Sequence, residues 1–105
     1  MRNEFNKYQF LRDLNEGIKA EIEAGNITDE YQIQEYIDSD LDNAVIYYAD
    51  CFEICKELNA TSFEGWDMGE PKDICQLAYF ALYEEVNNEL DRQELIELIE
   101  QKAEN

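Results

Sequence analysis

Apolar residues recur at intervals of three and four along almost the whole of this 105-residue chain. That spacing places them on one face of an α-helix, and no segment shows the strict alternation of a half-buried β-strand. A chain of this length forms one domain, and its hydrophobic content of 45% supplies a core. We therefore predict an all-α protein, a compact bundle of about four to five helices in a single domain spanning residues 1–105.

Capping signals divide this pattern into helices. The first helix is predicted over about residues 5–24, and Thr28 caps a short second helix. Pro71 opens a fourth helix, over about 71–89, and Asp91 caps the last one. The loop over 59–70 is expected to anchor on the core through its large apolar side chains, Phe63, Trp66 and Met68.

The third helix has the most apolar surface. Ser39 and Asp42 form a capping-box pattern, which predicts a helix over about 40–59. Two apolar stripes follow this helix, so we expect it to be buried on two sides, one of them a subunit contact. Its remaining surface carries carboxylates that fall within one narrow sector at about 100° per residue, namely Asp42, Asp50, Glu53 and Glu57.

The charge of the chain is the second constraint. Twenty-six Asp and Glu residues face eight Lys and Arg with no His, which gives a formal net charge of −18 at pH 7. Self-repulsion of this size weakens the compact state, so the acids are either a solubility device or the functional surface. Such a field repels nucleic acid and anionic membranes and attracts basic protein surfaces and cations. Because the chain has no apolar stretch of about 18 residues and no signal-peptide core, we expect it to be cytoplasmic.

The residue types of common catalytic sites are missing. Without His, the Ser–His and Cys–His pairs of nucleophilic enzymes are impossible, and a pair of carboxylates carries no signal among twenty-six. We expect no enzymatic activity, no catalytic residues and no cofactor. The three cysteines lie in apolar sequence and are expected to be reduced thiols of the core, Cys51, Cys55 and Cys75.

One acidic run imitates a calcium site. Asp38, Asp40 and Asp42 alternate as in the first half of an EF-hand loop. That loop needs glycine at its sixth position and glutamate at its twelfth, where this chain has Asn43 and Ala49. We therefore rank metal binding well below the other functions of the acids and predict no metal site.

The density of charge separates this chain from an ordinary acidic protein. A compact domain of this length has a radius of gyration near ~13 Å and a diameter of roughly 33 Å, so two copies end to end span about 65 Å. Two copies carry twice −18, which is −36. Duplex DNA has one phosphate per ~1.7 Å of axis, or about 38 over the same length. An elongated acidic homodimer would therefore present a column of charge similar to that of DNA.

A central block of the sequence resembles a known family. Residues 42–52, DNAVIYYADCF, are similar to a run of the Ocr antirestriction family of podophages, in which one extra residue interrupts the run. The resemblance extends to PKDI at 71–74 and LYE at 82–84, and it covers about residues 16–100. Members of that family copy the shape and charge of bent B-form DNA.

The resemblance implies an all-helical homodimer that blocks the DNA-binding groove of host type I restriction–modification enzymes. The partner is then a protein in the host cytoplasm, with no nucleic acid and no membrane. For the dimer interface it implies Phe52 and Ile74, with Lys56 where the family has a small residue, and the family's acidic tail is reduced to residues 101–105. The acids matched to the phosphate-mimicking surface are Glu16, Asp29, Glu35, Asp42, Asp50, Asp73, Glu84 and Glu89.

Helical geometry alone adds Glu53 and Glu57 to this acidic surface. The aromatic residues between Asp42 and Asp50 are expected to form a rigid core that holds these aspartates at fixed spacing. A phosphate mimic needs its charges in position before binding, because ordering them afterwards lowers affinity.

A second function remains open. The additional apolar face of the predicted third helix also fits an acidic adaptor, which would bind a protein partner without imitating DNA. Binding by a DNA mimic would weaken steeply as the salt concentration rises, whereas an apolar contact would barely weaken.

Overall fold

The computed structural model describes residues 5–60 and 73–104, and all regular structure within these ranges is helical. The helices are α1 (Lys7–Glu23), α2 (Glu30–Ala44), α3 (Tyr48–Glu57), α4 (Ile74–Glu89) and α5 (Arg92–Glu104). The predicted all-α architecture is therefore confirmed for the described ranges. The predicted loop from residue 61 onward, its anchors Phe63, Trp66 and Met68, and Pro71 lie outside them.

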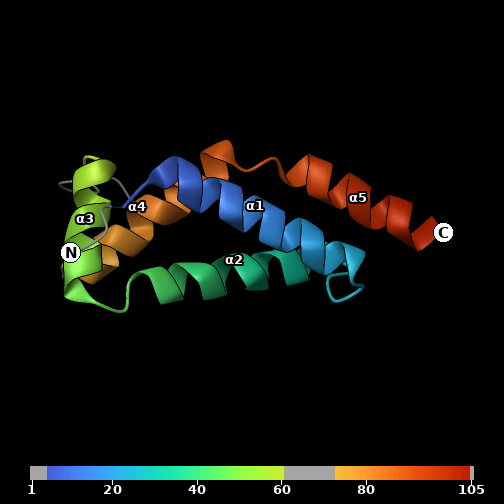
Figure 1. Cartoon of the computed structure of the whole chain (residues 1–105), viewed down its shortest axis with the longest axis horizontal. Coiled ribbons are helices and arrows are strands. Elements are labelled where there is room, and N and C mark those ends of the chain that lie inside the picture. Colours follow the sequence, from blue (N-terminus) through green and yellow to red (C-terminus); the bar gives the residue numbers. More distant parts are fainter. Residues whose placement is uncertain (1–4, 61–72, 105) are drawn as a thin grey trace.

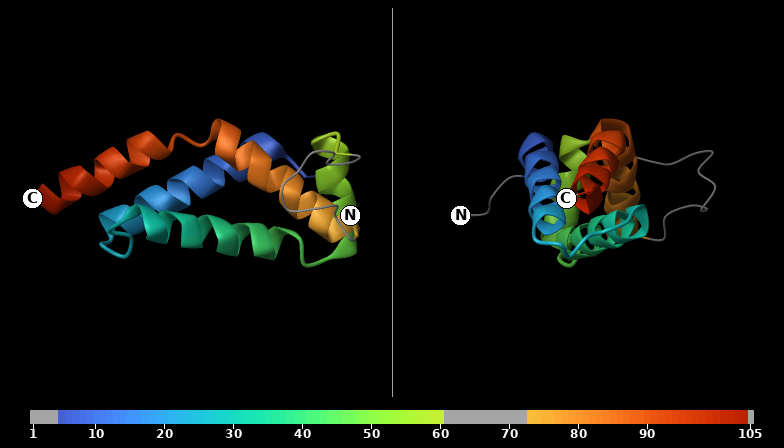
Figure 2. Two further views of the ribbon diagram at one scale, coloured as in Figure 1. Left: turned by 180° about the vertical axis from the view of Figure 1, so that it is seen from behind. Right: turned by 90° about the vertical axis from the view of Figure 1, so that its right-hand side faces the viewer.

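The helices pack as a flat, elongated bundle. Helices α1 and α2 run antiparallel, and α4 packs against α2 (Figure 1). Helix α3 lies across one end of this arrangement and makes its most extensive contact with α4, whereas α5 follows α1 toward the opposite end. Seen along the bundle in Figure 2, α1, α2 and the α4–α5 pair surround a common centre.

The chain is longer than the sphere that its length predicts. Its radius of gyration is 15.0 Å and its principal extents are 46 × 36 × 19 Å. A compact domain of this size would have a radius of gyration near ~13 Å. The single chain is therefore flatter and longer than a sphere of the same mass.

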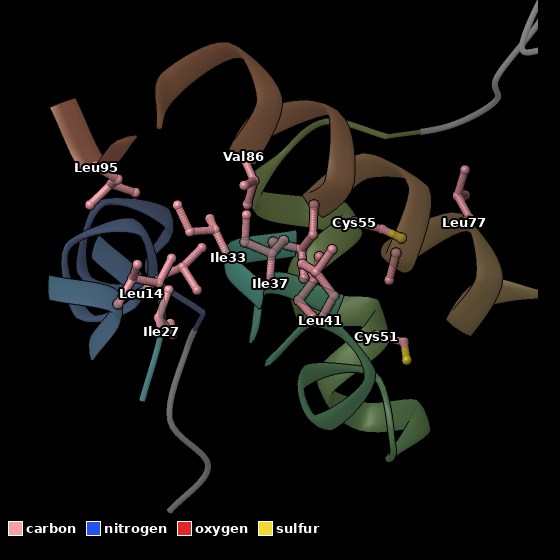
Figure 3. Close-up of a cluster of buried hydrophobic side chains, with 14 of the residues drawn as sticks. Leu14, Ile27, Ile33, Ile37, Leu41, Cys51, Cys55, Leu77, Val86 and Leu95 are labelled. Carbon is pink, nitrogen blue, oxygen red and sulfur yellow. The ribbon is translucent and has the colours of Figure 1, made fainter. Parts of the chain in front are cut away.

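A single hydrophobic cluster draws side chains from every described helix (Figure 3). On α1, Gly17 allows the Tyr36 ring of α2 to lie close, because a Cβ atom at Gly17 would collide with the Tyr36 hydroxyl. The apolar stripes predicted for the first, fourth and fifth helices supply much of this core. Its largest fully buried members are Leu14, Ile18, Ile22, Ile33, Ile37, Leu41, Ile54, Leu82, Val86 and Leu95.

The prediction of one continuous third helix over 40–59 is wrong. Helix α2 continues through Ser39 and Asp42 to Ala44, and the chain breaks at 45–47 before α3 begins at Tyr48. The physical reason lies in Leu41, which is fully buried four residues after Ile37 and so extends the inner stripe of α2. Burial of this side chain outweighs the capping preference of Ser39, and α3 begins without a side-chain cap.

Aspartate is the N-terminal cap of more helices than the sequence pattern predicted. The cap of α2 is Asp29, not Thr28, because the Asp29 carboxylate accepts the backbone N–H of Gln32. Helix α4 begins at Ile74 after the cap Asp73, later than the predicted residue 71. Asp91 accepts the Glu94 N–H at 3.1 Å, as its predicted capping role requires.

Candidate functional site: the acidic surface

The predicted phosphate-mimicking acids lie on or immediately before the first four helices. Glu16 lies on α1, and Glu35 and Asp42 lie on α2, while Asp29 and Asp73 cap α2 and α4. All members of the set are exposed except Glu53, which is half-buried. The members on α3 are Asp50, Glu53 and Glu57, and those on α4 are Glu84 and Glu89.

Three lysines of the described helices, Lys7, Lys19 and Lys102, form salt bridges with acids outside the predicted set. Three salt bridges connect α1 with α4 and α5, namely Lys7–Glu85 at 3.4 Å, Lys19–Glu94 at 2.7 Å and Lys102–Glu23 at 3.8 Å. Their side chains are partly exposed, so each pair adds little to stability. None of the three glutamates belongs to the predicted set, so no member of that set is the partner in these three salt bridges.

Two of the predicted acids are held in place by the backbone. The Asp29 carboxylate accepts the Gln32 N–H at 2.8 Å, and the Asp73 carboxylate accepts the Gln76 N–H at 2.9 Å. Each carboxylate lies at the N-terminus of its helix, where the helix dipole favours negative charge. These two charges are thus fixed before any partner arrives.

The predicted strip of carboxylates on one helix is corrected by the break at 45–47. Asp42 lies on α2 and faces α4. Burial, followed by the charges of Asp38 and Asp42, raises the pKa of the Tyr79 phenol on α4. Asp50, Glu53 and Glu57 remain together on α3 at helical spacing. Asp42 therefore lies on a different helix from the other three acids.

An acidic cleft joins α2 to α3. Its volume is about 390 Å³, and it is open to solvent. Asp50 and Glu53 of α3 face Asp40 and Asn43 of α2 across it. Its apolar wall is made by Phe5, Phe10, Ala44 and Ile54.

Asp40 is the acid of this cleft that the sequence did not single out. Its only distinction in sequence was its place in the alternating run with Asp38 and Asp42. In the structure, partial burial raises the pKa of the Asp40 carboxyl above its ordinary value. The folded chain therefore binds a proton at Asp40 more readily than the unfolded chain does, so ionised Asp40 lowers stability at neutral pH.

We expect Asp40→Asn to raise the free energy of unfolding at pH 7. The gain should shrink as the pH falls through the raised pKa of Asp40 and should vanish below the ordinary pKa of aspartate, where the wild-type carboxyl is protonated in both states. Denaturant unfolding at a series of pH values measures this. Asp42→Asn is the matched control, because it removes the same charge from an exposed site on the same helix. Equal gains from the two variants would show that general repulsion, not burial, acts at Asp40.

Each of the two apolar stripes predicted around residues 41–58 is divided between core and surface. Cys51 and Ile54 of one stripe and Cys55 of the other are buried at the contact with α4. An exposed apolar patch lies on the turn before α3 and on the outer side of α3, consisting of Ile46, Tyr47, Tyr48 and Phe52. The tyrosines were expected to be core, and that expectation is wrong, since Tyr47 is 69% and Tyr48 61% exposed.

The predicted dimer-interface residues lie on or near this apolar patch. Phe52 is 59% exposed and belongs to it, and Lys56 is exposed one helical turn further along α3. Ile74 is half-buried at the start of α4, and its carbonyl oxygen contacts the Cys55 sulfur at 3.9 Å. The structure thus leaves Phe52 and Lys56 accessible to a partner, with Ile74 less so.

Comparison with protein-family models, curated proteins and solved structures finds no match to this chain.

The described residues define the chemistry of the site. Among them, no group of three or more Cys, Asp or Glu side chains is placed to hold a metal ion. None of the described helices has the length and hydropathy needed to span a membrane. The surface offers carboxylates on or next to α1–α4 and an apolar patch next to Asp50, so it can bind basic and apolar groups of another protein.

Proposed function

We propose that this protein is a DNA mimic that occupies the DNA-binding groove of a host type I restriction–modification enzyme, or of a related DNA-based defence complex. It acts in the host cytoplasm as a stoichiometric inhibitor, without catalysis and without a cofactor. The observation that carries the proposal is a net charge of −18 on a rigid helical body 46 Å long.

The density of charge supports this proposal. Duplex DNA presents about 27 phosphates over 46 Å at one per ~1.7 Å of axis. The chain has 26 Asp and Glu residues, and its net charge of −18 is about two-thirds of the DNA value. A basic groove shaped for DNA would therefore attract this protein strongly, and competition with duplex DNA for a type I enzyme tests the proposal.

The positions of the acids support it as well. Helices hold most of the predicted carboxylates at fixed spacing, and backbone hydrogen bonds fix Asp29 and Asp73. Preplaced charges bind without the entropic cost of ordering flexible side-chain segments. A disordered acidic chain of the same composition would lack this advantage.

The second candidate function is that of an acidic adaptor. The exposed apolar patch of Ile46, Tyr47, Tyr48 and Phe52 favours it, because aromatic residues are enriched at the centres of protein interfaces. An adaptor would hold its partner through this patch and would tolerate salt, whereas a DNA mimic would lose its target as salt rises. Salt dependence of target binding therefore separates the two functions.

In the DNA-mimic proposal, the apolar patch is the contact between two copies, with Phe52 at its centre. We expect a dimer in sedimentation experiments at micromolar concentration. Phe52→Ser should weaken it by about 30-fold or more, as for a central aromatic residue of an interface. Tyr31→Ser is the control, because Tyr31 is 72% exposed at the far end of α2.

Salt gives this prediction a second readout. Two copies repel each other through −18 charges each, so added salt should strengthen the dimer while it weakens binding to the enzyme. A wild-type chain that sediments as a monomer at both low and high salt would contradict the dimer.

A further inference from the structure

Two free thiols meet across the contact between α3 and α4. The Sγ atoms of Cys51 and Cys75 lie 2.7 Å apart. Cys51 is fully buried on the inner side of α3, and Cys75 is half-buried in the first turn of α4. This distance exceeds the length of a disulfide bond, about 2.0 Å, by less than 1 Å.

The third cysteine has a different partner. Cys55 lies one turn after Cys51 on α3, where both belong to the buried cluster (Figure 3). Its sulfur contacts the Ile74 carbonyl oxygen at 3.9 Å. Proximity thus selects one pair from the three thiols, namely Cys51 with Cys75.

We propose that Cys51 and Cys75 are a reversible disulfide site that pins α3 to α4 when a low-molecular-weight disulfide acts as the oxidant. In the first step the Cys75 thiolate attacks the small disulfide, which forms a mixed disulfide and releases one small thiolate. In the second step the Cys51 sulfur attacks the Cys75 sulfur, which forms the internal disulfide and releases the second small thiolate. Two electrons pass to the small disulfide, and the two thiol protons pass to the departing thiolates.

The order of these steps follows from access. Cys75 is the more exposed of the two residues, so a reagent in solution reaches it first. Burial, followed by the neighbouring Cys75, raises the pKa of the Cys51 thiol to about 12. Cys51 is therefore protonated near neutral pH and does not attack the reagent first, because only thiolates attack disulfides rapidly. In the mixed disulfide Cys51 must give up its proton before it attacks the Cys75 sulfur, so this second step is the slower one.

The disulfide would connect the parts of α3 and α4 that lie next to two of the predicted acids. Asp50 directly precedes Cys51, and Asp73 lies two residues before Cys75. A link between these cysteines closes the chain from residue 51 to residue 75 and restricts the unfolded state. This inference does not depend on the proposed function, since it concerns the α3–α4 contact alone.

The test uses the full chain, purified in reductant and then incubated with glutathione disulfide. Samples are quenched in acid, alkylated under unfolding conditions and mapped by peptide mass spectrometry. We expect glutathione on Cys75 first, followed by a form that has lost two thiols and joins the Cys51 and Cys75 peptides. The melting temperature of this form should rise by about 10 °C, and reductant should reverse the rise.

Two variants give the matched comparison. Cys55→Ser should still form the internal bond, whereas Cys75→Ser should form none, and circular dichroism verifies that both are folded. Three results would overturn the inference: a Cys51–Cys55 bond, covalent dimers in place of the internal bond, or glutathione that stays on Cys75 without loss of a second thiol.

Discussion

An equimolar amount of this protein should abolish both DNA cleavage and DNA methylation by a type I restriction–modification enzyme at low salt. Both activities require the same DNA-binding groove, so a protein that fills the groove stops them together. The effect should be independent of the recognition sequence, because carboxylates imitate the phosphate backbone and not the edges of the bases. Inhibition should be complete at a fixed stoichiometry and show no turnover.

The measurement is a titration of cleavage and methyl transfer against increasing amounts of the protein. Salt provides the second dimension, since a ligand that replaces six to ten phosphate contacts loses about 10³–10⁵ in affinity between 50 and 200 mM salt. An uncharged competitor for an apolar surface would show no such slope. The type I assignment fails if the enzyme cleaves DNA unhindered at low salt with the protein in excess. If the protein also binds no other DNA-processing complex in a host lysate, the DNA-mimic proposal fails with it.

The helical core was predictable because burial and spacing agree along most of the chain. Leu14, Ile18 and Ile22 recur at intervals of four, and each is buried as the amphipathic pattern of α1 requires. The start of α5 was predicted correctly as well, because Asp91 accepts the Glu94 N–H as a helix cap. Such local rules work where a single apolar face meets a single core.

The same rules failed between residues 39 and 48, where two signals compete. Ser39 and Asp42 carry the chemistry of a helix start, yet Leu41 lies between them at the next turn of the α2 stripe. The burial of Leu41 depends on its packing against helices that are distant in the sequence. Capping preferences carry no information about such contacts. The start of α3 at Tyr48 has no side-chain cap that a sequence pattern could have identified.

The acidic surface was predictable as a charge but only partly as a geometry. The excess of 26 acids over eight bases is visible in composition, and the exposure of most matched acids follows from their place opposite the apolar stripes. The acidic cleft was not predictable, because it depends on the turn that brings Asp40 of α2 opposite Asp50 of α3. The lysine pairs join helices far apart in the chain, so sequence could not show which acids they neutralise.

These lysine pairs make placement of charge testable against total charge. Neutralising four acids of α2 and α3 as Asp42→Asn, Asp50→Asn, Glu53→Gln and Glu57→Gln changes the net charge from −18 to −14, four fewer negatives. Each exposed acid is worth about 0–1 kcal/mol in a contact, so the quadruple variant should bind the enzyme on the order of 30-fold more weakly. Any single member should cost about fivefold at most. Competition between the variant and labelled duplex DNA for the enzyme measures both.

The matched control removes the same number of charges at other sites. Glu23→Gln, Glu85→Gln and Glu94→Gln affect acids that already face lysines, and Glu97→Gln adds an exposed acid of α5. None of these four acids belongs to the predicted acidic surface, so this variant should bind within about fivefold of the wild type although its net charge is also −14. Equal losses in the two quadruple variants would mean that the enzyme senses total charge and not its placement. Loss of all inhibition from one acid-to-amide change would instead identify a single ionic hot spot, which is incompatible with a surface that works as a column of phosphates.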